Sequence, residues 1–298
     1  MTLRELGEEK LLARIAVSGS KSRQVVGGVR DDCAVLKTAA KGWLLLKTDA
    51  VVEGVHFRAS ASAAGVGWKA MMRPLSDIAA MAGQPQFALI TLALPGKTDV
   101  SWVTSLYRGL RRAAVRFGVE IVGGETTAIA GGRVISVSVA GRVDAGRCVF
   151  RSGGKVDDAL FVTGRLGGSI AGRHLKFTPR IEEARWLAAH FDVHAMMDLS
   201  DGLAADLPRL ARASGVGYSL QLARVPRSRG CTVEEALNDG EDYELLFALP
   251  SDEVARLEKA WPRKFPRLPL TRIGNLVRAG KNRSQTLRGG YDHFRQPE

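Results

Sequence analysis

The sequence has few cysteines and none of the spacings that hold a metal or a disulfide framework. Its three cysteines, Cys33, Cys148 and Cys231, lie far apart and form no CxxC pair. This pattern excludes a disulfide-stapled fold and predicts reduced thiols in a core or in loops. With 298 residues the chain can bury enough apolar surface to fold without such cross-links.

Long apolar runs and leader-like segments are also missing. No apolar run approaches the roughly 20 residues that a membrane-spanning helix needs. The first residues, MTLRELGEEKLLARIAVSG, are charged and amphipathic, unlike a signal peptide. We therefore expect a cytoplasmic protein with no membrane contact. A composition of 45% apolar and 25% charged residues is typical of globular proteins.

Acidic residues are fewer than basic ones: the sequence has 31 Asp and Glu and 43 Lys and Arg, which gives a net charge of +12. Such a charge attracts polyanions in general: nucleic acid, nucleotides or an acidic membrane surface. The basic residues are nevertheless scattered over helix-like segments and are not interleaved with aromatic residues, as they are in single-strand binders. A solvated basic surface is therefore favoured over a nucleic-acid site.

The standard nucleotide-binding motifs are absent as well. Gly96-Lys97-Thr98 resembles the end of a P-loop, but Thr91 stands where the first glycine is required. The segment GVGWKA at 65–70 fits GxGxxA but does not follow a strand-like run, so it lacks the context of a dinucleotide site. HExxH, GxSxG and the protein-kinase motifs are missing too.

Helix-like and strand-like segments mix in both halves of the chain without strict βα alternation. This mixture favours an α+β fold. A basic, glycine-rich segment at 144–155 separates the halves, so we expect two domains, 1–147 and 148–298. The alternation in VISVSVAGRV predicts a half-buried strand at 134–143.

Three local predictions concern segments around the expected site. Residues 3–17 have a helical period of apolar residues. Residues 61–83 have a helical composition that Pro74 is expected to interrupt. The segment GRLGGSIAG at 164–172 is expected to be a glycine-rich loop that leads into a helix.

The stretch MMRPLSDIAAMAGQP at 71–85 contains one carboxylate, Asp77, in an otherwise small and apolar helical run. A carboxylate is costly to bury unless it is paired, hydrogen-bonded or bound to a cation. One interpretation is that Asp77 caps a helix that begins at Pro74 or Ser76. The other is that Asp77 is a ligand.

Further isolated acids favour the second interpretation. Each lies at the end of an apolar run, where a strand is expected to finish and where open α/β proteins place their ligands. These acids are Asp31, Asp32, Asp49, Glu125, Asp198 and Asp201.

Oxygen ligands with few histidines or cysteines beside them select Mg²⁺ rather than Zn²⁺. Converging carboxylates would repel one another unless divalent cations held them, and Mg²⁺ usually brings phosphates. Glycine pairs at 123–124 and 167–168 would let backbone amides approach a phosphate. The alternative, that these acids are unrelated caps and turn residues, stays open at this point.

An ordered set of motifs carries a family resemblance. The motifs are GVRDDCAVL, KTDAVVEGVHF, PLSDIAAMAGQP, IVGGETT, RSGGKVDDALFVTG, HLKFTPRI, MMDLSDGLAADL, DGEDYELLF and GYDHF. Together, from about residue 27 to 294, they resemble the thiamine-monophosphate kinase family, which belongs to the superfamily of aminoimidazole ribonucleotide synthetase and selenophosphate synthetase.

The resemblance implies a two-domain PurM-like fold. The N-terminal sheet would pair with that of a second subunit into a dimer-spanning barrel, and the C-terminal domain would be an α+β sandwich. It implies ATP-dependent phosphorylation of thiamine monophosphate to thiamine diphosphate by direct in-line transfer with several Mg²⁺ ions. The implied partners are thiamine monophosphate, ATP and a second copy of the chain.

Matching motif to motif carries the family's site over to this sequence. The implied metal ligands are Asp32, Thr48, Asp49, Asp77, Glu125, Asp198 and Asp201, of which Asp49, Asp77 and Asp201 would serve catalysis. The implied ATP contacts are Gly124, Arg151 and Ser200. The implied thiamine contacts are His56, Glu241 and Tyr291.

The sequence departs from the family pattern at several of these motifs. Arg30 and Asp239 stand at glycine positions, Glu125 replaces an aspartate, and Arg73-Pro74 replaces residues that continue a helix. Two other interpretations therefore stay open. One is a divergent superfamily enzyme that uses ATP on another small molecule, and the other is a Mg-nucleotide or nucleic-acid binder without turnover.

Overall fold

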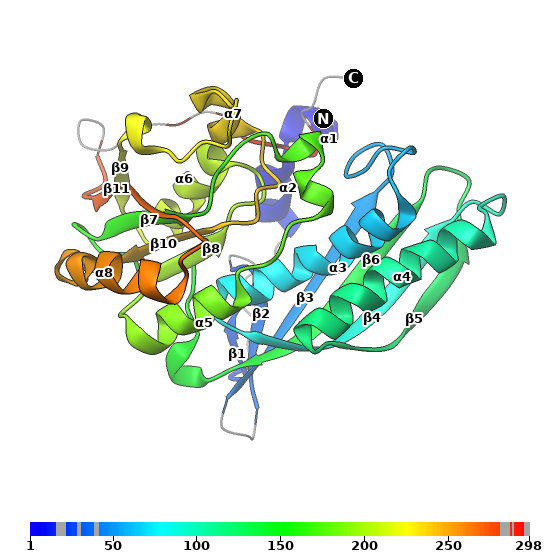
Figure 1. Cartoon of the computed structure of the whole chain (residues 1–298), viewed down its shortest axis with the longest axis horizontal. Helices are drawn as coiled ribbons and strands as arrows, with labels where there is room; N and C mark the ends of the chain where they lie inside the picture. The colour runs from blue at the N-terminus through cyan, green and yellow to red at the C-terminus, as the bar shows by residue number, and fades with distance from the viewer. Residues whose placement is uncertain (16–21, 29–30, 39–41, 281–286, 288, 295–298) are drawn as a thin grey trace.

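The strands form two sheets, one from each half of the chain (Figure 1). The computed structural model describes residues 1–15, 22–28, 31–38, 42–280, 287 and 289–294. Helices pack on one face of the first sheet and on both faces of the second. The mixed helix and strand content agrees with the predicted α+β class.

The first sheet has six strands and is antiparallel except at one edge. Its order is β1 (Val25–Gly27), β2 (Ala34–Lys37), β3 (Trp43–Val52), β6 (Val134–Val143), β4 (Gln84–Leu94) and β5 (Glu120–Ala128). The strand predicted at 134–143 is confirmed, with alternating buried side chains. The pair β4 and β5 is parallel because helix α4 (Val100–Phe117) crosses between them.

Helix α3 (Ala63–Ala80) packs against this sheet and against α4. It begins at Ser62, whose hydroxyl accepts a hydrogen bond from the Gly65 amide at 3.2 Å. The GVGWKA segment is therefore the first part of a helix and not a phosphate loop. The prediction that Pro74 interrupts the helix is wrong, because α3 runs through it, and the capping interpretation of Asp77 is wrong because this residue lies inside α3.

Two glycines set the distance between α3 and α4. A Cβ atom on Gly67 would lie 2.1 Å from the Leu106 carbonyl oxygen, and one on Gly109 would lie 2.0 Å from the Ala64 carbonyl oxygen. The two backbones therefore touch, and neither position has room for a side chain.

The second sheet has five antiparallel strands and is buried on both faces. Its order is β8 (Ala195–Asp198), β10 (Leu245–Leu249), β7 (Ala159–Thr163), β11 (Leu270–Val277) and β9 (Gly217–Leu220). Helices α6 (Leu203–Ala213) and α7 (Val233–Asn238) cover one face, and α5 (Ile181–His190) and α8 (Val254–Lys264) cover the other. This double cover explains why β7, β8 and β10 are continuous apolar runs.

Two local predictions need correction. The helix predicted at 3–17 is two helices, α1 (Leu3–Leu6) and α2 (Glu8–Ile15), because Gly7 adopts φ 75° between them. The segment at 164–172 does not enter an α-helix but continues into the short 3₁₀ turns η2 (Ser169–Ala171) and η3 (Arg173–Leu175). Residue 16 and residue 17 of the first prediction lie outside the described residues.

Helix α3 also joins the two halves. It contacts α5 and β8, and Phe177, Ile181 and Tyr243 from the second half complete the core of the first sheet. The segments near the two termini also meet, since the Glu8 amide lies 3.4 Å from the Asp292 carboxylate. The domain boundary at 147/148 stays a prediction. In the described part of the chain, no helix has the length and apolarity to cross a membrane.

Substituting Gly109 by alanine should destabilise the protein, although alanine favours helices, because the new methyl group would collide with the Ala64 carbonyl. We expect the free energy of unfolding to fall by about 2 kcal/mol or more, measured by urea unfolding followed by circular dichroism. Gly96→Ala is the control, because a Cβ atom there meets no atom within 4 Å. Equal stability of the two variants would contradict the close helix contact.

Candidate functional site

Three carboxylates meet where the two halves of the chain join. Oxygen atoms of Asp32, Asp77 and Asp198 all lie within 4.8 Å of one another, and all three residues are buried. Asp32 precedes β2, Asp77 lies in α3 and Asp198 ends β8. Three separate elements therefore build the cluster, which explains why its members are dispersed in the sequence.

Two cations and one hydroxyl contact this cluster. Lys47 on β3 places its Nζ 2.7 Å from Asp77 Oδ1, and Arg151 donates to Asp32 Oδ1 through Nη2 at 2.5 Å. The Ser76 hydroxyl donates to Asp198 Oδ2 at 2.6 Å. Asp32 Oδ2 is buried and accepts no hydrogen bond from the described residues. The cluster therefore has spare acceptor capacity.

The protonation of the cluster depends on its burial. Burial raises the pKa of Asp77 well above its usual value, although Lys47 opposes this shift. Burial and the neighbouring Asp32 raise the pKa of Asp198 to about 7. A divalent cation would remove this penalty, because it favours the charged carboxylates. Hard oxygen donors, an unused acceptor and raised pKa values together fit a Mg²⁺ site.

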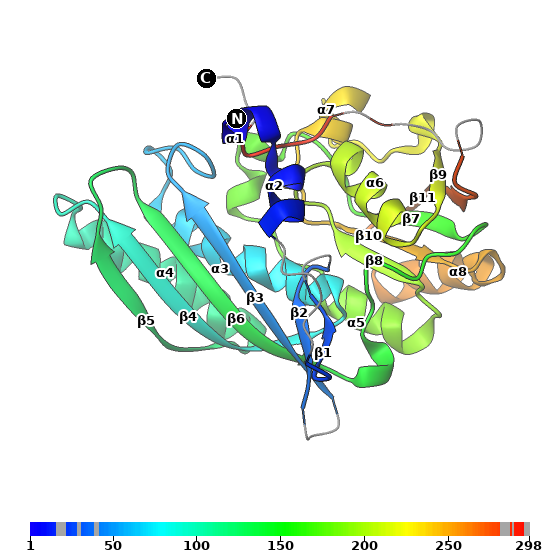
Figure 2. The same ribbon diagram turned by 180° about the vertical axis from the view of Figure 1, so that it is seen from behind.

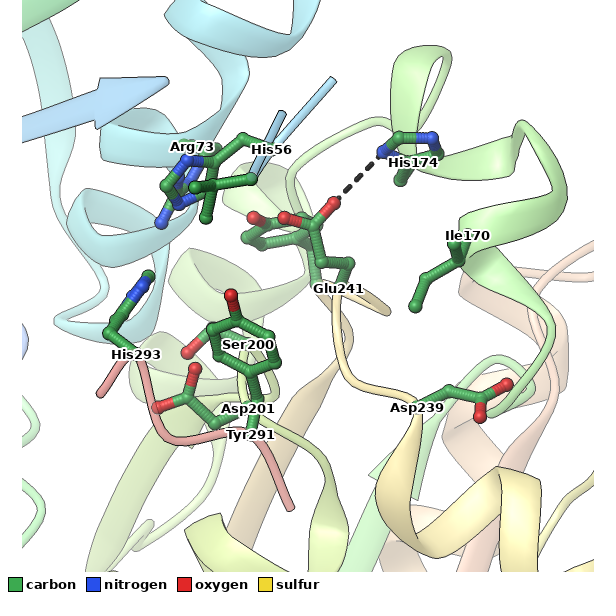
Figure 3. Close-up of a pocket in the computed structure, with 12 residues that line it drawn as sticks. His56, Arg73, Ile170, His174, Ser200, Asp201, Asp239, Glu241, Tyr291 and His293 are labelled. Carbon is green, nitrogen blue, oxygen red and sulfur yellow. Dashed lines mark hydrogen bonds and ion pairs between the residues drawn. The ribbon is translucent and has the colours of Figure 1, made fainter. Parts of the chain in front are cut away.

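A pocket lies beside the cluster, since its lining includes Arg73, one turn before Asp77, and Ser200, two residues after Asp198. Figure 3 shows this pocket. Its lining combines aromatic, apolar and charged side chains, as small-molecule sites do. The lining residues are Val55, His56, Arg73, Ile170, His174, Ser200, Asp201, Asp239, Glu241, Tyr243, Tyr291 and His293.

A buried lysine anchors one wall of this pocket. Lys69 on α3 forms an ion pair with Glu241 and donates to the His56 carbonyl oxygen at 2.6 Å. The His174 Nδ1 lies 2.9 Å from Glu241 Oε2 (Figure 3). Burial lowers the pKa of Lys69 to about 8. Burial acts to raise the pKa of Glu241, but His174 and Lys69 lower it to about 2, so Glu241 is an anion.

His56 is neutral in this setting. Burial, with the charge of Arg73 in addition, lowers its pKa to about 3. Its Nδ1 therefore accepts the hydrogen bond from the Val52 amide, at 3.1 Å. The ring faces the pocket as an uncharged surface beside His293, whose ring centre is 5.4 Å away.

The segment that follows Asp198 is held by a second ion-pair network. Asp206 on α6 accepts hydrogen bonds from the backbone amides of Ser200 and Asp201, each at 3.1 Å. Arg209 reaches Asp201 at 2.5 Å and Asp206 at 2.8 Å. The Tyr291 amide donates to the Asp201 carbonyl at 2.9 Å. These contacts fix Ser200, Asp201 and Tyr291 along the pocket.

Other predicted site residues lie outside the cluster. Asp49 is 3.6 Å from Arg73, on the side of β3 that also carries Lys47. Thr48 is exposed and bonds to the Ser138 hydroxyl at 3.0 Å. Glu125 is exposed on β5 and accepts from the next amide, at 2.9 Å.

Gly124 has a structural reason to be glycine, since a Cβ atom there would lie 1.8 Å from the Ile90 carbonyl oxygen. The expectation that each of the further isolated acids ends a strand is wrong for Asp49 and Glu125, which lie within β3 and β5. The strands run on because their neighbours continue the hydrogen-bonded ladder past these acids.

The departures from the family pattern have identifiable surroundings. Asp239 lines the pocket, and its Oδ2 accepts from the Gly168 amide at 2.7 Å. Asp242 accepts from the Gly167 amide at 3.1 Å. We expected the backbone amides of this glycine pair to face a phosphate, but in the structure they donate hydrogen bonds to carboxylates. Arg30 lies outside the described residues.

Sequence reasoning missed several charged residues of the site: Lys47, Lys69, Arg73, His174, Asp206 and Arg209. One signal was available. Lys69, Arg73 and Asp77 recur every four residues in an apolar helix, so they share a face. The other pairings join distant segments and have no local signature.

Comparison with known proteins defines first the class and then the family. Residues 30–143 match the family described as AIR synthase related protein, N-terminal domain, and residues 150–285 match the corresponding C-terminal domain. The chain therefore has the two-domain PurM-like architecture of that class.

The most informative relatives are thiamine-monophosphate kinases. That of Rhodopirellula baltica is 37% identical over 91% of this chain and 89% of its own length. That of Salmonella typhimurium is 33% identical over 98% of this chain and 99% of its own. The solved structure of AaThiL complexed with AMPPCP and TMP matches with a TM-score of 0.84 at 33% identity, over 98% and 99% of the two chains. This chain belongs to the thiamine-monophosphate kinase family.

Asp198→Asn should stabilise the metal-free protein at high pH. The folded-state pKa of about 7 exceeds the unfolded value of about 3.9. The stability that Asp198 contributes is therefore complete below about pH 4 and is lost as the pH rises to about 7. A neutral amide avoids this loss. In chelator, we expect the variant to melt several degrees above the unmodified protein at pH 8 and close to it at pH 4.

Differential scanning fluorimetry with and without MgCl₂ measures both the effect of pH and the effect of Mg²⁺ on the melting temperature. Mg²⁺ should raise the melting temperature of the unmodified protein and should raise that of the variant much less. Asp252→Asn is the control, because Asp252 is exposed and lies on the far helix layer. If the variant melted below the unmodified protein at pH 8, the buried Asp198 carboxylate would not destabilise the fold and the prediction would be wrong.

Proposed function

We propose that this protein transfers the γ-phosphoryl group of ATP to thiamine monophosphate and so forms thiamine diphosphate. The observation that carries the proposal is the buried cluster of Asp32, Asp77 and Asp198 beside a pocket with aromatic and charged walls. Family membership supports the substrates, since AaThiL was solved with AMPPCP and TMP. Because the proposed reaction consumes ATP, which cells keep inside their membrane, the proposed location is the cytoplasm.

Mg²⁺ is the proposed cofactor. Asp32, Asp77 and Asp198 would hold it, and the further proposed ligands are Thr48, Asp49, Glu125 and Asp201, which lie outside the cluster. When bound, such ions neutralise the phosphates and stabilise an in-line transfer. Asp49, Asp77 and Asp201 are the proposed catalytic residues among these ligands.

The chain's own groups position the substrates. Arg151 presents a planar fork for phosphate oxygens and, with Ser200 and Gly124, is the proposed ATP contact. His56, neutral and facing the pocket, and Tyr291 offer ring surfaces to a heterocycle. Glu241 supplies the negative charge that a cationic thiazolium ring requires. Direct transfer needs positioning and charge neutralisation more than a covalent intermediate.

Asp77→Asn should abolish most of the activity, because it removes a central charge of the cluster. We expect ADP formation from Mg-ATP and thiamine monophosphate to fall on the order of a hundredfold or more, with chromatography identifying thiamine diphosphate as the product. Asp99→Asn is the matched control, because Asp99 is exposed and its side chain makes no capping bond. Lack of turnover by the unmodified protein would rule out the proposed reaction.

A homodimer is the proposed assembly. Figure 2 shows the face of the first sheet opposite α3 and α4, which no helix within the described ranges covers. Apolar side chains of β3, β4 and β5 are exposed there. Leu46, Phe87, Leu89 and Val122 are 40%, 43%, 48% and 57% exposed. Such an apolar surface on a sheet is typical of an interface, and pairing of two copies through it would give the dimer-spanning barrel of the family.

Leu89→Glu should separate the dimer, because it places a charge in the centre of this apolar surface. By sedimentation velocity we expect the unmodified protein at twice the chain mass of 32.1 kDa and the variant at that mass. Val115→Glu is the control, since Val115 is 84% exposed on α4, behind the sheet. An unmodified protein that sediments as a monomer at micromolar concentration would refute the dimer.

A further inference from the structure

The guanidinium of Arg73 makes only some of the hydrogen bonds that it could make to other groups of the protein. Its Nη1 donates to the Ala50 carbonyl oxygen at 2.8 Å, and its Nη2 lies 3.6 Å from Asp49 Oδ1, beyond hydrogen-bond distance. Its Nε is buried and has no acceptor among the described residues. A guanidinium has five N–H donors, so burial with one hydrogen bond is unfavourable without a further partner.

The position of Arg73 indicates what that partner is. Among the described residues that line the pocket, Arg73 is the only lysine or arginine. It lies on α3 one turn before Asp77, so its guanidinium is near the carboxylate cluster. In Figure 3 it stands beside His56 and faces the side of the pocket formed by Glu241, Ser200 and Tyr291. Arg73 thus lies one helical turn from Asp77 of the carboxylate cluster and also lines the pocket proposed for the thiamine rings.

We propose that Arg73 binds the phosphate group of thiamine monophosphate, an inference that rests on the proposed function. That phosphate must lie next to the carboxylate cluster, because one of its oxygens accepts the transferred phosphoryl group. A guanidinium matches two phosphate oxygens with parallel N–H donors. Its charge also reduces the repulsion between the acceptor phosphate and the triphosphate of ATP.

The competing explanation is that Arg73 serves only as a counter-ion for Asp49. The two explanations differ in which ligand they affect. Thiamine and thiamine monophosphate share both rings and differ only in the phosphate, so a phosphate contact changes the binding of one and not of the other. Loss of a counter-ion for Asp49 would instead alter the dependence of activity on Mg²⁺ concentration. It would change the Kd values of thiamine and thiamine monophosphate by the same factor.

Isothermal titration calorimetry of the full chain with each ligand tests the proposal. For Arg73→Met we expect the Kd of thiamine monophosphate to rise on the order of tenfold or more, as for loss of a charged hydrogen bond. The Kd of thiamine should stay within about twofold. For Arg73→Lys the Kd of thiamine monophosphate should lie between those of the unmodified protein and of Arg73→Met, because lysine keeps the charge but not the planar pair of N–H donors. The KM for thiamine monophosphate should follow its Kd.

Arg151→Met is the matched comparison, since it removes the same charge on the other side of the cluster and should raise the KM for ATP instead. Parallel loss of both thiamine ligands in Arg73→Met, or no loss of either, would overturn the assignment while turnover by the unmodified protein upheld the proposed function. Absence of turnover by the unmodified protein would overturn the function and, with it, the role of Arg73.

Discussion

Burial of three carboxylates at one point is the constraint on which the rest of this structure depends. Asp32, Asp77 and Asp198 come from a loop, a helix and a strand, and they meet only because α3 packs against both sheets. Like charges in a medium of low polarity repel each other strongly. Lys47, Arg151 and Ser76 reduce that repulsion, and each of them comes from a different segment.

Helix α3 meets two requirements that compete for the same residues. Gly67 must have no side chain because the helix touches α4 there, and the apolar residues on the sheet side fill the core. The remaining face carries Lys69, Arg73 and Asp77 at intervals of four. The helix thus orients charged groups toward the pocket with the rigidity of the core behind them, which suits a site that works by positioning.

Local patterns in the sequence predicted those features that depend on neighbouring residues. The alternation of 134–143 predicted β6, and the single acid in an apolar run singled out Asp77, which lies in the carboxylate cluster while its role as a ligand stays a prediction. Features set by distant partners could not be predicted. Pro74 stays helical because packing on both sides of α3 outweighs the lost hydrogen bond, and Glu125 lies within β5 because pairing with β4 extends that strand.

Among the site residues, too, those with a distinctive local motif could be predicted and those defined by distant partners could not. Asp32 and Asp198 were found because their motifs are distinctive, whereas Lys47 gave no signal, since a lysine on a strand is ordinary until its partner across the fold is known. Arg209 was missed for the same reason, because it pairs with Asp201 and Asp206 only through the turn at the start of α6. Networks of charge pairs are a property of the fold and not of the local sequence.

The departures from the family pattern bear on whether this chain still performs chemistry. Asp239 is bonded to the Gly168 amide and Arg73 to the Ala50 carbonyl, so both are integrated in an ordered pocket. Replacing buried acids by neutral residues is commonly stabilising, and a protein without need of a cation would gain from that change. Here Asp77 and Asp198 remain, although burial raises the pKa of each. A chain that keeps so costly a cluster beside an intact pocket is better explained by an enzyme that binds Mg²⁺ and phosphates than by a fold that has lost its reaction.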